Sequence, residues 1–152
     1  MPFDAAPTCE TRIPIADAED VLVARQKTRD TARCLGFGAV DQARVARIAG
    51  ELARNALLYA GAGECRIRAQ GVEGAARITL ELEDAGPGIP DVPAALAPGF
   101  SSDCGGGKGL PIVKKLACAL TIESRPGRTL VTARFERRRG IDFCRDCIKD
   151  GM

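Results

Sequence analysis

The sequence predicts an α+β fold, a two-layer sandwich in which about three helices cover one face of a mostly antiparallel mixed sheet. Three observations lead to this prediction. Helical periods occupy the first part of the chain, strict apolar and polar alternation follows, and a further helix and two strands complete the pattern. With 152 residues, 45% of them hydrophobic, the chain is long and apolar enough to build one core.

Two helices are predicted before the alternation begins. Asp17 stands where an N-cap is expected, Asp20 follows three residues later, and apolar residues then recur at helical spacing until glycines at 36 and 38. A second helix is predicted from Val40 to Ala60, and Gly61 ends it. The apolar stripe of this helix consists of Val45, Ile48, Leu52, Ala56 and Tyr59.

The hydrophobic period then changes to two. Cys65–Ala69 and Ile78–Glu83 alternate on either side of a turn at 71–74, which predicts an antiparallel hairpin with one buried face. A connection rich in glycine and proline follows and runs from residue 84 to 109. The remaining predicted elements are a short helical turn at 92–96, a helix from Leu110, and strands at 120–124 and 129–136.

Composition and charge exclude several classes of function. The formal net charge of +2 argues against a dedicated nucleic-acid-binding protein, in which positive charge is concentrated. The chain contains no histidine, which excludes a Ser-His-Asp triad, a histidine-ligated zinc and a phosphohistidine within it. No apolar run approaches the roughly 20 residues of a membrane-spanning helix, and we expect no signal peptide and a cytoplasmic location.

One domain is expected at residues 1–136, followed by a basic tail at 137–152 that contains cysteines. The tail begins with three arginines and holds a CxxC pair at Cys144 and Cys147. A zinc site would need a second such pair, and the other cysteines among the seven are scattered singly. We therefore expect reduced, free thiols.

Asp84 is the first candidate for a functional residue. It shares the apolar face of its predicted strand, where an unpaired carboxylate would be strongly unfavourable. Gly86 and Gly88 follow it and allow another group to approach the backbone closely. From these residues alone, Asp84 either binds a ligand or caps a turn.

Two further signals lie on the predicted helices. Glu51 and Asn55 stand one turn apart at the edge of the apolar stripe, where a polar pair is ordinarily solvated. The glycine run at 105–109, with Lys108 inside it, leads into the third long helix. Free amides at a helix N-terminus together with a lysine favour a phosphate site, although such a run also suits a flexible lid.

Taken in this order, the three groups resemble the nucleotide-binding boxes of the GHKL (Bergerat-fold) ATPase and kinase superfamily. The resemblance extends from about Ile13 to Phe135. Within the superfamily, the sequence is most similar to the anti-sigma-factor serine/threonine kinases, and in particular to the RsbT-type switch kinases. The segments that carry the resemblance are ELARNALLYA (51–60), DAGPGIPD (84–91), GFSS (99–102) and GKGLPIVKKL (107–116).

The resemblance implies a role for each candidate residue, with ATP and magnesium as cofactors. Glu51 would be the general base, and Asn55 would hold magnesium against the phosphates of ATP. Asp84 would accept a hydrogen bond from the adenine amino group, with Gly86 and Gly88 allowing the base to approach. The residues that would contact the phosphates or line the nucleotide pocket are Gly105, Gly107, Lys108, Gly109, Leu110 and Thr129.

The glycine box departs from the pattern of the family, which commonly reads Gly-Leu-Gly-Leu-Gly-Leu. Here Gly106 and Lys108 replace two leucines. Lys108 either adds a contact to the phosphates or weakens the packing of the lid and with it the affinity for nucleotide.

The resemblance implies a cytoplasmic serine/threonine kinase that phosphorylates a STAS-domain antagonist or scaffold protein in a partner-switching pathway regulating a sigma factor. One alternative is an anti-sigma factor that sequesters a sigma subunit. The other is a non-catalytic adaptor that activates a PPM-type phosphatase. The presence of both Glu51 and Asn55 favours the kinase.

Overall fold

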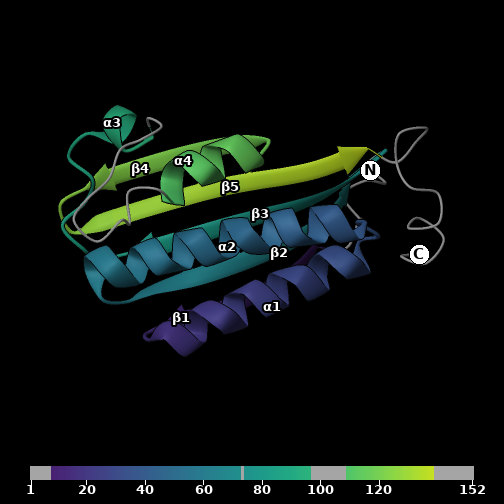
Figure 1. The fold of residues 1–152 in the computed structure, drawn as a ribbon, viewed down its shortest axis with the longest axis horizontal. Coiled ribbons are helices and arrows are strands. Elements are labelled where there is room, and N and C mark those ends of the chain that lie inside the picture. Colours follow the sequence, from purple (N-terminus) through teal and green to yellow (C-terminus); the bar gives the residue numbers. More distant parts are fainter. Residues whose placement is uncertain (1–7, 73, 97–108, 139–152) are drawn as a thin grey trace.

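The computed structural model describes residues 8–72, 74–96 and 109–138, which form a five-stranded sheet with helices packed on one face (Figure 1). The strand order is β1-β2-β3-β5-β4, and each neighbouring pair is antiparallel. The predicted α+β sandwich is confirmed. The strands are β1 (Thr8–Ile15), β2 (Gly63–Val72), β3 (Ala75–Asp84), β4 (Ala119–Arg125) and β5 (Arg128–Arg138).

The helices of the described chain are α1 (Ala18–Cys34), α2 (Ala39–Ala60), the short α3 (Val92–Leu96) and α4 (Gly109–Leu116). α1 begins with the predicted cap, because Asp17 accepts from the Asp20 N–H at 3.1 Å and Asp20 accepts from the Asp17 N–H at 3.3 Å. α2 ends where Gly61 adopts a φ of 79°, a conformation that glycine adopts readily. α1, α2 and α4 lie side by side over the same face of the sheet (Figure 1).

β1 is an element that the sequence analysis did not predict. Its segment contains Pro14, which has no N–H to donate and is confined to edge strands or bulges in sheets. β1 is an edge strand that pairs only with β2, so Pro14 is tolerated there. None of the helices in the described ranges is long and apolar enough to span a membrane.

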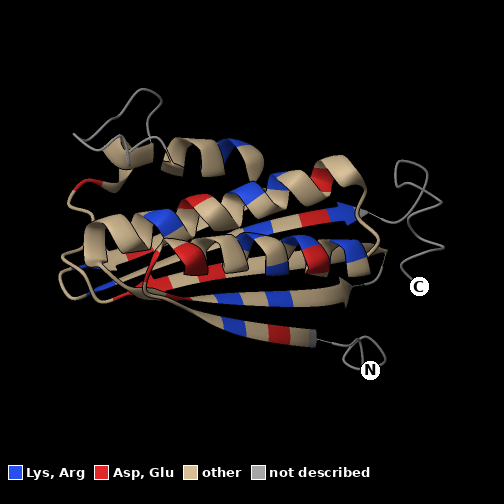
Figure 2. Ribbon diagram, turned by 60° about the horizontal axis from the view of Figure 1, so that its bottom comes forward, with Lys and Arg blue, Asp and Glu red and all other residues tan. Residues whose placement is uncertain are grey.

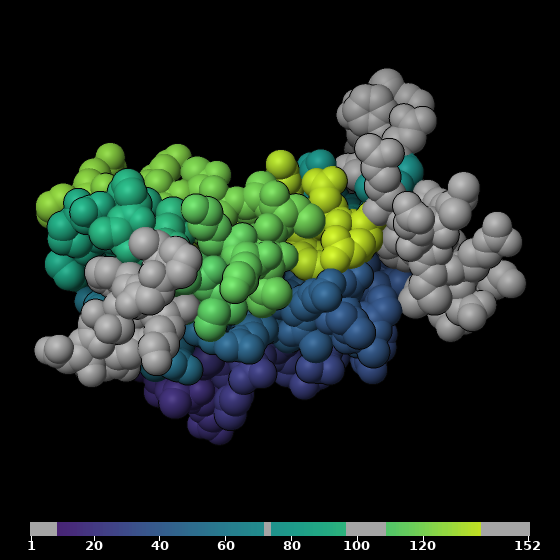
Figure 3. Space-filling model, turned by 45° about the horizontal axis from the view of Figure 1, so that its top comes forward, coloured from purple at the N-terminus to yellow at the C-terminus, as the bar shows by residue number. Residues whose placement is uncertain are grey.

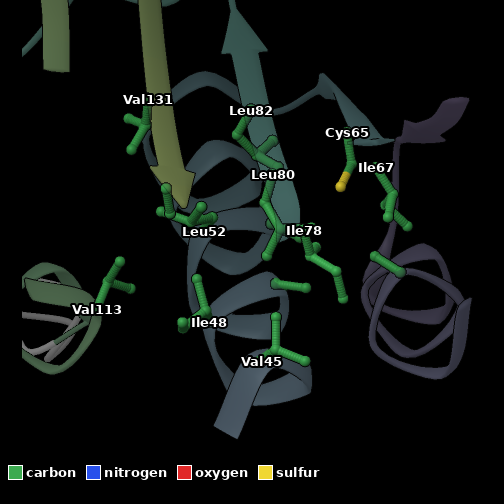
Figure 4. Close-up of a cluster of buried hydrophobic side chains, with 14 of the residues drawn as sticks. Val45, Ile48, Leu52, Cys65, Ile67, Ile78, Leu80, Leu82, Val113 and Val131 are labelled. Atoms are coloured by element: carbon green, nitrogen blue, oxygen red, sulfur yellow. The ribbon is translucent and has the colours of Figure 1, made fainter. Parts of the chain in front are cut away.

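The core lies between α2 and the three central strands (Figure 4). Along α2, Val45, Ile48 and Leu52 are at most 2% exposed and face the sheet. The alternating residues of β3 meet them there, so the predicted hairpin turns its apolar face to the helices. The side chains that the sheet contributes to the core include Cys65, Ile67, Ile78, Leu80, Leu82, Val131, Ala133 and Phe135.

The opposite face of the sheet carries charged side chains that pair with one another across the strands (Figure 2). Arg66 contacts Glu64, Glu81 and Glu83 at 2.7, 2.9 and 3.1 Å respectively. Arg128 contacts Glu83 at 2.7 Å and, together with Arg66, holds the pKa of Glu83 below its usual value. The arginines of this face are thus largely neutralised by glutamates on neighbouring strands.

Candidate active site

A cavity of about 340 Å³ opens between α2, the ends of β3 and β5, and α4. This volume falls within the range of about 300 to 1,000 Å³ that is usual for small-molecule sites. The polar side chains that line it among apolar neighbours include Asn55, Asp84, Asp91 and Thr129. The apolar lining includes Leu52, Leu82, Ile89, Ala95, Leu110 and Val131.

Asp84 is the last residue of β3 and lies at the cavity wall. Its Oδ1 accepts a hydrogen bond from the Gly86 N–H at 2.9 Å, which fixes the carboxylate against the turn that follows the strand. Asp84 therefore caps this turn and lines the cavity at the same time. The turn cap, one of the two roles that the sequence left open, is confirmed, and ligand binding by Asp84 stays a prediction that its place at the cavity supports.

Glycine is required twice in this turn. A Cβ atom on Gly86 would lie 2.6 Å from the Cβ atom of Ala60, at the end of α2. Gly88 has a φ of 89°, and a Cβ atom there would lie 2.8 Å from the carbonyl oxygen of Arg125 on β4. The turn is held between α2 and β4, which places both Gly88 and Asp84 at the cavity.

Thr129 is buried at the start of β5, directly opposite Asp84 in the register of β3 and β5. Its hydroxyl lies 2.8 Å from that of Ser124, the residue opposite it on β4. Ser124 in turn accepts a hydrogen bond from the Ile89 N–H at 2.7 Å. The sequence analysis did not identify Ser124, whose position on the inner face of β4 was the available signal.

Glu51 and Asn55 meet at the first residue of α4. A Cβ atom on Gly109 would lie 3.0 Å from Glu51 Oε1, and 3.1 and 3.2 Å from the amide nitrogen and oxygen of Asn55. Glycine at this position allows α4 to approach both side chains. α4 lies between α2 and β4, as Figure 3 shows from above this edge of the molecule.

The second carboxylate oxygen of Glu51 faces another side chain. Glu51 Oε2 lies 3.5 Å from the Nε of Arg47, one turn earlier on α2, and the Glu51 side chain is 15% exposed. Glu51 thus points one oxygen toward α4 and the other toward Arg47. The sequence analysis did not assign Arg47 to the site.

The structure therefore brings together eight of the sequence-predicted site residues. They are Glu51, Asn55, Asp84, Gly86, Gly88, Gly109, Leu110 and Thr129, with Gly109 at the contact between α2 and α4. Gly105, Gly107 and Lys108 lie outside the described residues, and so do Cys144 and Cys147. Within the described part of the chain, no group of three or more Cys, Asp or Glu side chains is arranged to hold a metal ion.

The family described as "Histidine kinase-like ATPase domain" matches residues 15–135. A relative from Bacillus subtilis (strain 168), named "Serine/threonine-protein kinase RsbT", is 44% identical over 108 residues, which cover 71% of this chain and 81% of the relative. Because the family match takes in the cavity, the Glu51 and Asn55 pair and the start of α4, the chain belongs to the histidine kinase-like (GHKL) ATPase superfamily and, within it, to the RsbT-like anti-sigma-factor kinases.

Proposed function

We propose that this chain is a cytoplasmic, ATP- and magnesium-dependent protein kinase that phosphorylates a serine or threonine of a STAS-domain protein. This reaction would belong to a partner-switching pathway that regulates a sigma factor. The observation that carries the proposal is the meeting of Glu51 and Asn55 at Gly109, beside the cavity lined by Asp84 and Thr129. The Bacillus subtilis relative is named as a serine/threonine-protein kinase, which supports the same activity.

The cavity suits the adenine base of ATP. Its apolar walls would bury the faces of the ring, and the carboxylate of Asp84 is an acceptor for the exocyclic amino group. The Thr129 hydroxyl adds a second polar group at the same end of the cavity. Because Gly86 and Gly88 have no side chains, the adenine ring could approach the backbone of this turn closely.

The phosphates would lie toward α4 and Asn55. A magnesium ion would neutralise part of the phosphate charge, and the amide oxygen of Asn55 would hold it. One protein ligand is sufficient because magnesium keeps several of its water ligands. The first amides of α4, at Gly109 and Leu110, have no partner within the helix and are suited to phosphate oxygens. Gly105, Gly107 and Lys108 would extend this contact.

The transfer step needs one proton acceptor. We assign this role to Glu51, whose carboxylate would take the proton from the seryl or threonyl hydroxyl of the substrate protein. The hydroxyl oxygen forms a bond to the γ-phosphorus as the bond to the β,γ-bridging oxygen breaks, and ADP leaves. The new phosphate adds about −1.5 to −2 charges to the substrate protein, enough to change which partner it binds.

Glu51→Gln tests this assignment because it removes the base and preserves the size of the side chain. Purified chain, magnesium and γ-labelled ATP are incubated with STAS-domain proteins from the same host. We expect Glu51→Gln to bind ATP normally and to transfer phosphate roughly 10²–10⁴-fold more slowly than the wild type. Asn55→Ala should instead lose the magnesium-dependent part of nucleotide binding.

Three outcomes would contradict the proposal. Transfer by Glu51→Gln at the wild-type rate would remove Glu51 from the reaction. Stable binding of a sigma subunit without any transfer would favour an anti-sigma factor. Stimulation of a PPM-type phosphatase by a chain that transfers no phosphate would favour the non-catalytic adaptor.

A further inference from the structure

Three arginines share or approach the face of α2 that carries Glu51, and we define them as the arginine ridge: Arg25 on α1, and Arg47 and Arg54 on α2. Residues 47, 51 and 54 follow one another at intervals of four and three along α2, so they share one face of the helix. Arg25, Arg47 and Arg54 are all exposed. Figure 2 shows the cationic positions along both helices on this side of the molecule.

Arg25 reaches this face because α2 has a glycine at position 50. A Cβ atom on Gly50 would lie 2.7 Å from Cδ and 2.9 Å from Cγ of Arg25, and 3.3 Å from its Nε. Glycine is less favourable than alanine inside a helix. Glycine at position 50 leaves room for the methylene groups of Arg25, whose side chain extends from α1 to α2 beside Gly50.

The cations of the ridge are poorly neutralised by comparison with those of the sheet. Arg25 and Arg54 make no ion pair with any residue that the structure describes, and Arg47 has only its 3.5 Å contact with Glu51. The other acidic residue of α2, Asp41, is bound by Arg137 at 2.8 Å. On the outer sheet face, in contrast, Arg66 alone contacts three glutamates.

We propose that the arginine ridge binds acidic side chains of the phosphoacceptor protein that lie next to its reactive hydroxyl. The inference rests on the proposed role of Glu51. A hydroxyl that gives its proton to Glu51 brings the surrounding surface of its protein over the exposed side of α2, which carries Arg47 and Arg54 of the ridge. Exposed guanidinium groups without partners match carboxylates and steer an acidic surface to this place.

Charge reversal of Arg25 and Arg54 tests the ridge, because neither residue contacts Glu51 or lines the cavity. Arg33→Glu is the matched control: it lies on the same helix, eight residues beyond Arg25, and is 72% exposed. We expect Arg25→Glu and Arg54→Glu each to raise the KM for the STAS-domain substrate about tenfold at low salt, with unchanged ATP affinity. Arg33→Glu should change that KM less than about twofold.

Peptide binding provides a second measurement that does not require phosphoryl transfer. Two fluorescent peptides carry one central serine, flanked in the first by glutamates and in the second by lysines. With magnesium and a non-hydrolysable ATP analogue present, the wild type should bind the acidic peptide at least about tenfold more tightly, and Arg25→Glu/Arg54→Glu should lose this preference.

The two measurements separate the ridge from the proposed function. If the wild type transfers no phosphate, the proposed kinase activity is contradicted. The peptide measurement then tests by itself whether the ridge binds acidic side chains. The ridge is wrong if the wild type binds both peptides equally, or if Arg25→Glu and Arg54→Glu have the KM of the Arg33→Glu control. For the Arg25→Glu and Arg54→Glu variants, a substrate whose acidic residues are changed to lysine should have a lower KM than the unchanged substrate.

Discussion

At the scale of single residues, Asp84 uses one oxygen for the protein and leaves the other for a ligand. Its Oδ1 accepts from the Gly86 N–H, and Oδ2 has no hydrogen bond within the described residues. Asparagine at this position keeps an oxygen for Gly86 but presents an NH₂ group in place of Oδ2. The substitution therefore separates the turn from the proposed contact with adenine.

We expect Asp84→Asn to lower the affinity for ATP by about 1–3 kcal/mol, the range for a buried polar group facing the wrong partner. The melting temperature without ligand should stay close to that of the wild type, because the Gly86 bond is preserved. Titration calorimetry with ATP and a thermal melt measure the two quantities. An unchanged ATP affinity would show that Asp84 serves the turn alone.

Gly86 packs directly against Ala60 at the end of α2. The Cβ atom of Gly86→Ala would lie 2.6 Å from the Cβ atom of Ala60, too close for two carbon atoms. We expect Gly86→Ala to destabilise the fold by about 1–3 kcal/mol, as overpacking does, and to weaken ATP binding. Ala60→Gly should recover part of both losses in the double variant, which a double-mutant cycle by urea unfolding would measure. If the effects of the two substitutions are simply additive, the contact between positions 86 and 60 is not the cause of the destabilisation.

At the scale of elements, the helices and the hairpin could be predicted because their apolar residues repeat at the periods of helix and strand. Asp17 with Asp20 also indicated correctly where α1 begins. β1 could not be predicted in this way, because Pro14 interrupts its pattern and its pairing with β2 joins residues about 50 to 60 positions apart in the sequence. An edge strand owes its place to tertiary pairing more than to its own sequence.

The candidate site was predictable in part for the same reason. Helical projection places Glu51 and Asn55 on one side of α2, and strand alternation places Asp84 and Thr129 on the inner face. The contact of Gly109 with Glu51 and Asn55 depends on the path of the chain between β3 and α4, which no local period encodes. Ser124 was missed because it contacts the site through Thr129 on the neighbouring strand. Arg47 was missed because it contacts the site through Glu51, one turn later on α2.

One contact between elements links the end of β5 to the start of α2. Arg137 binds Asp41 through two hydrogen bonds of 2.8 and 3.0 Å, and its guanidinium lies 4.5 Å from the centre of the Phe135 ring. Bidentate pairs and contacts of a cation with an aromatic face are among the stronger polar interactions at partly exposed sites. The bond to Asp41 also raises the pKa of Arg137 above its usual value.

We expect Arg137→Ala to lower the free energy of unfolding by about 1–2 kcal/mol, more than an exposed ion pair contributes. Arg134→Ala is the control: this residue lies on the same strand, 46% exposed, with a 3.5 Å contact to Glu136. Urea unfolding of both variants measures the difference. Equal effects would show that the Asp41 contact contributes no more than a surface pair.

At the scale of the whole molecule, α2 connects the parts of the proposed reaction. Its buried face forms the centre of the core, its flank carries Asn55 at the cavity, and its exposed face carries two arginines of the ridge. The sheet separates these surfaces from its own charged outer face, where arginines and glutamates pair. A substrate protein and a nucleotide would thus approach the same helix from two sides, with Glu51 between them.

The stability of the whole molecule should fall at alkaline pH because of Cys65. This thiol is fully buried on β2, and burial raises its pKa from 9.0 to about 12. Between these two values the unfolded chain loses the thiol proton while the native chain keeps it. Unfolding then releases a proton, and the free energy of unfolding decreases by up to about 1.4 kcal/mol for each pH unit.

Cys65→Ala removes this titration, although its cavity lowers stability at every pH by a constant amount of about 1–3 kcal/mol. We therefore expect the gap between the wild type and Cys65→Ala, measured by urea unfolding, to narrow by about 2 kcal/mol between pH 8 and 10.5. Groups elsewhere that titrate in this range affect both proteins alike and cancel in the difference. A gap that stays constant with pH would show that the native protein ionises Cys65 as readily as the unfolded chain does.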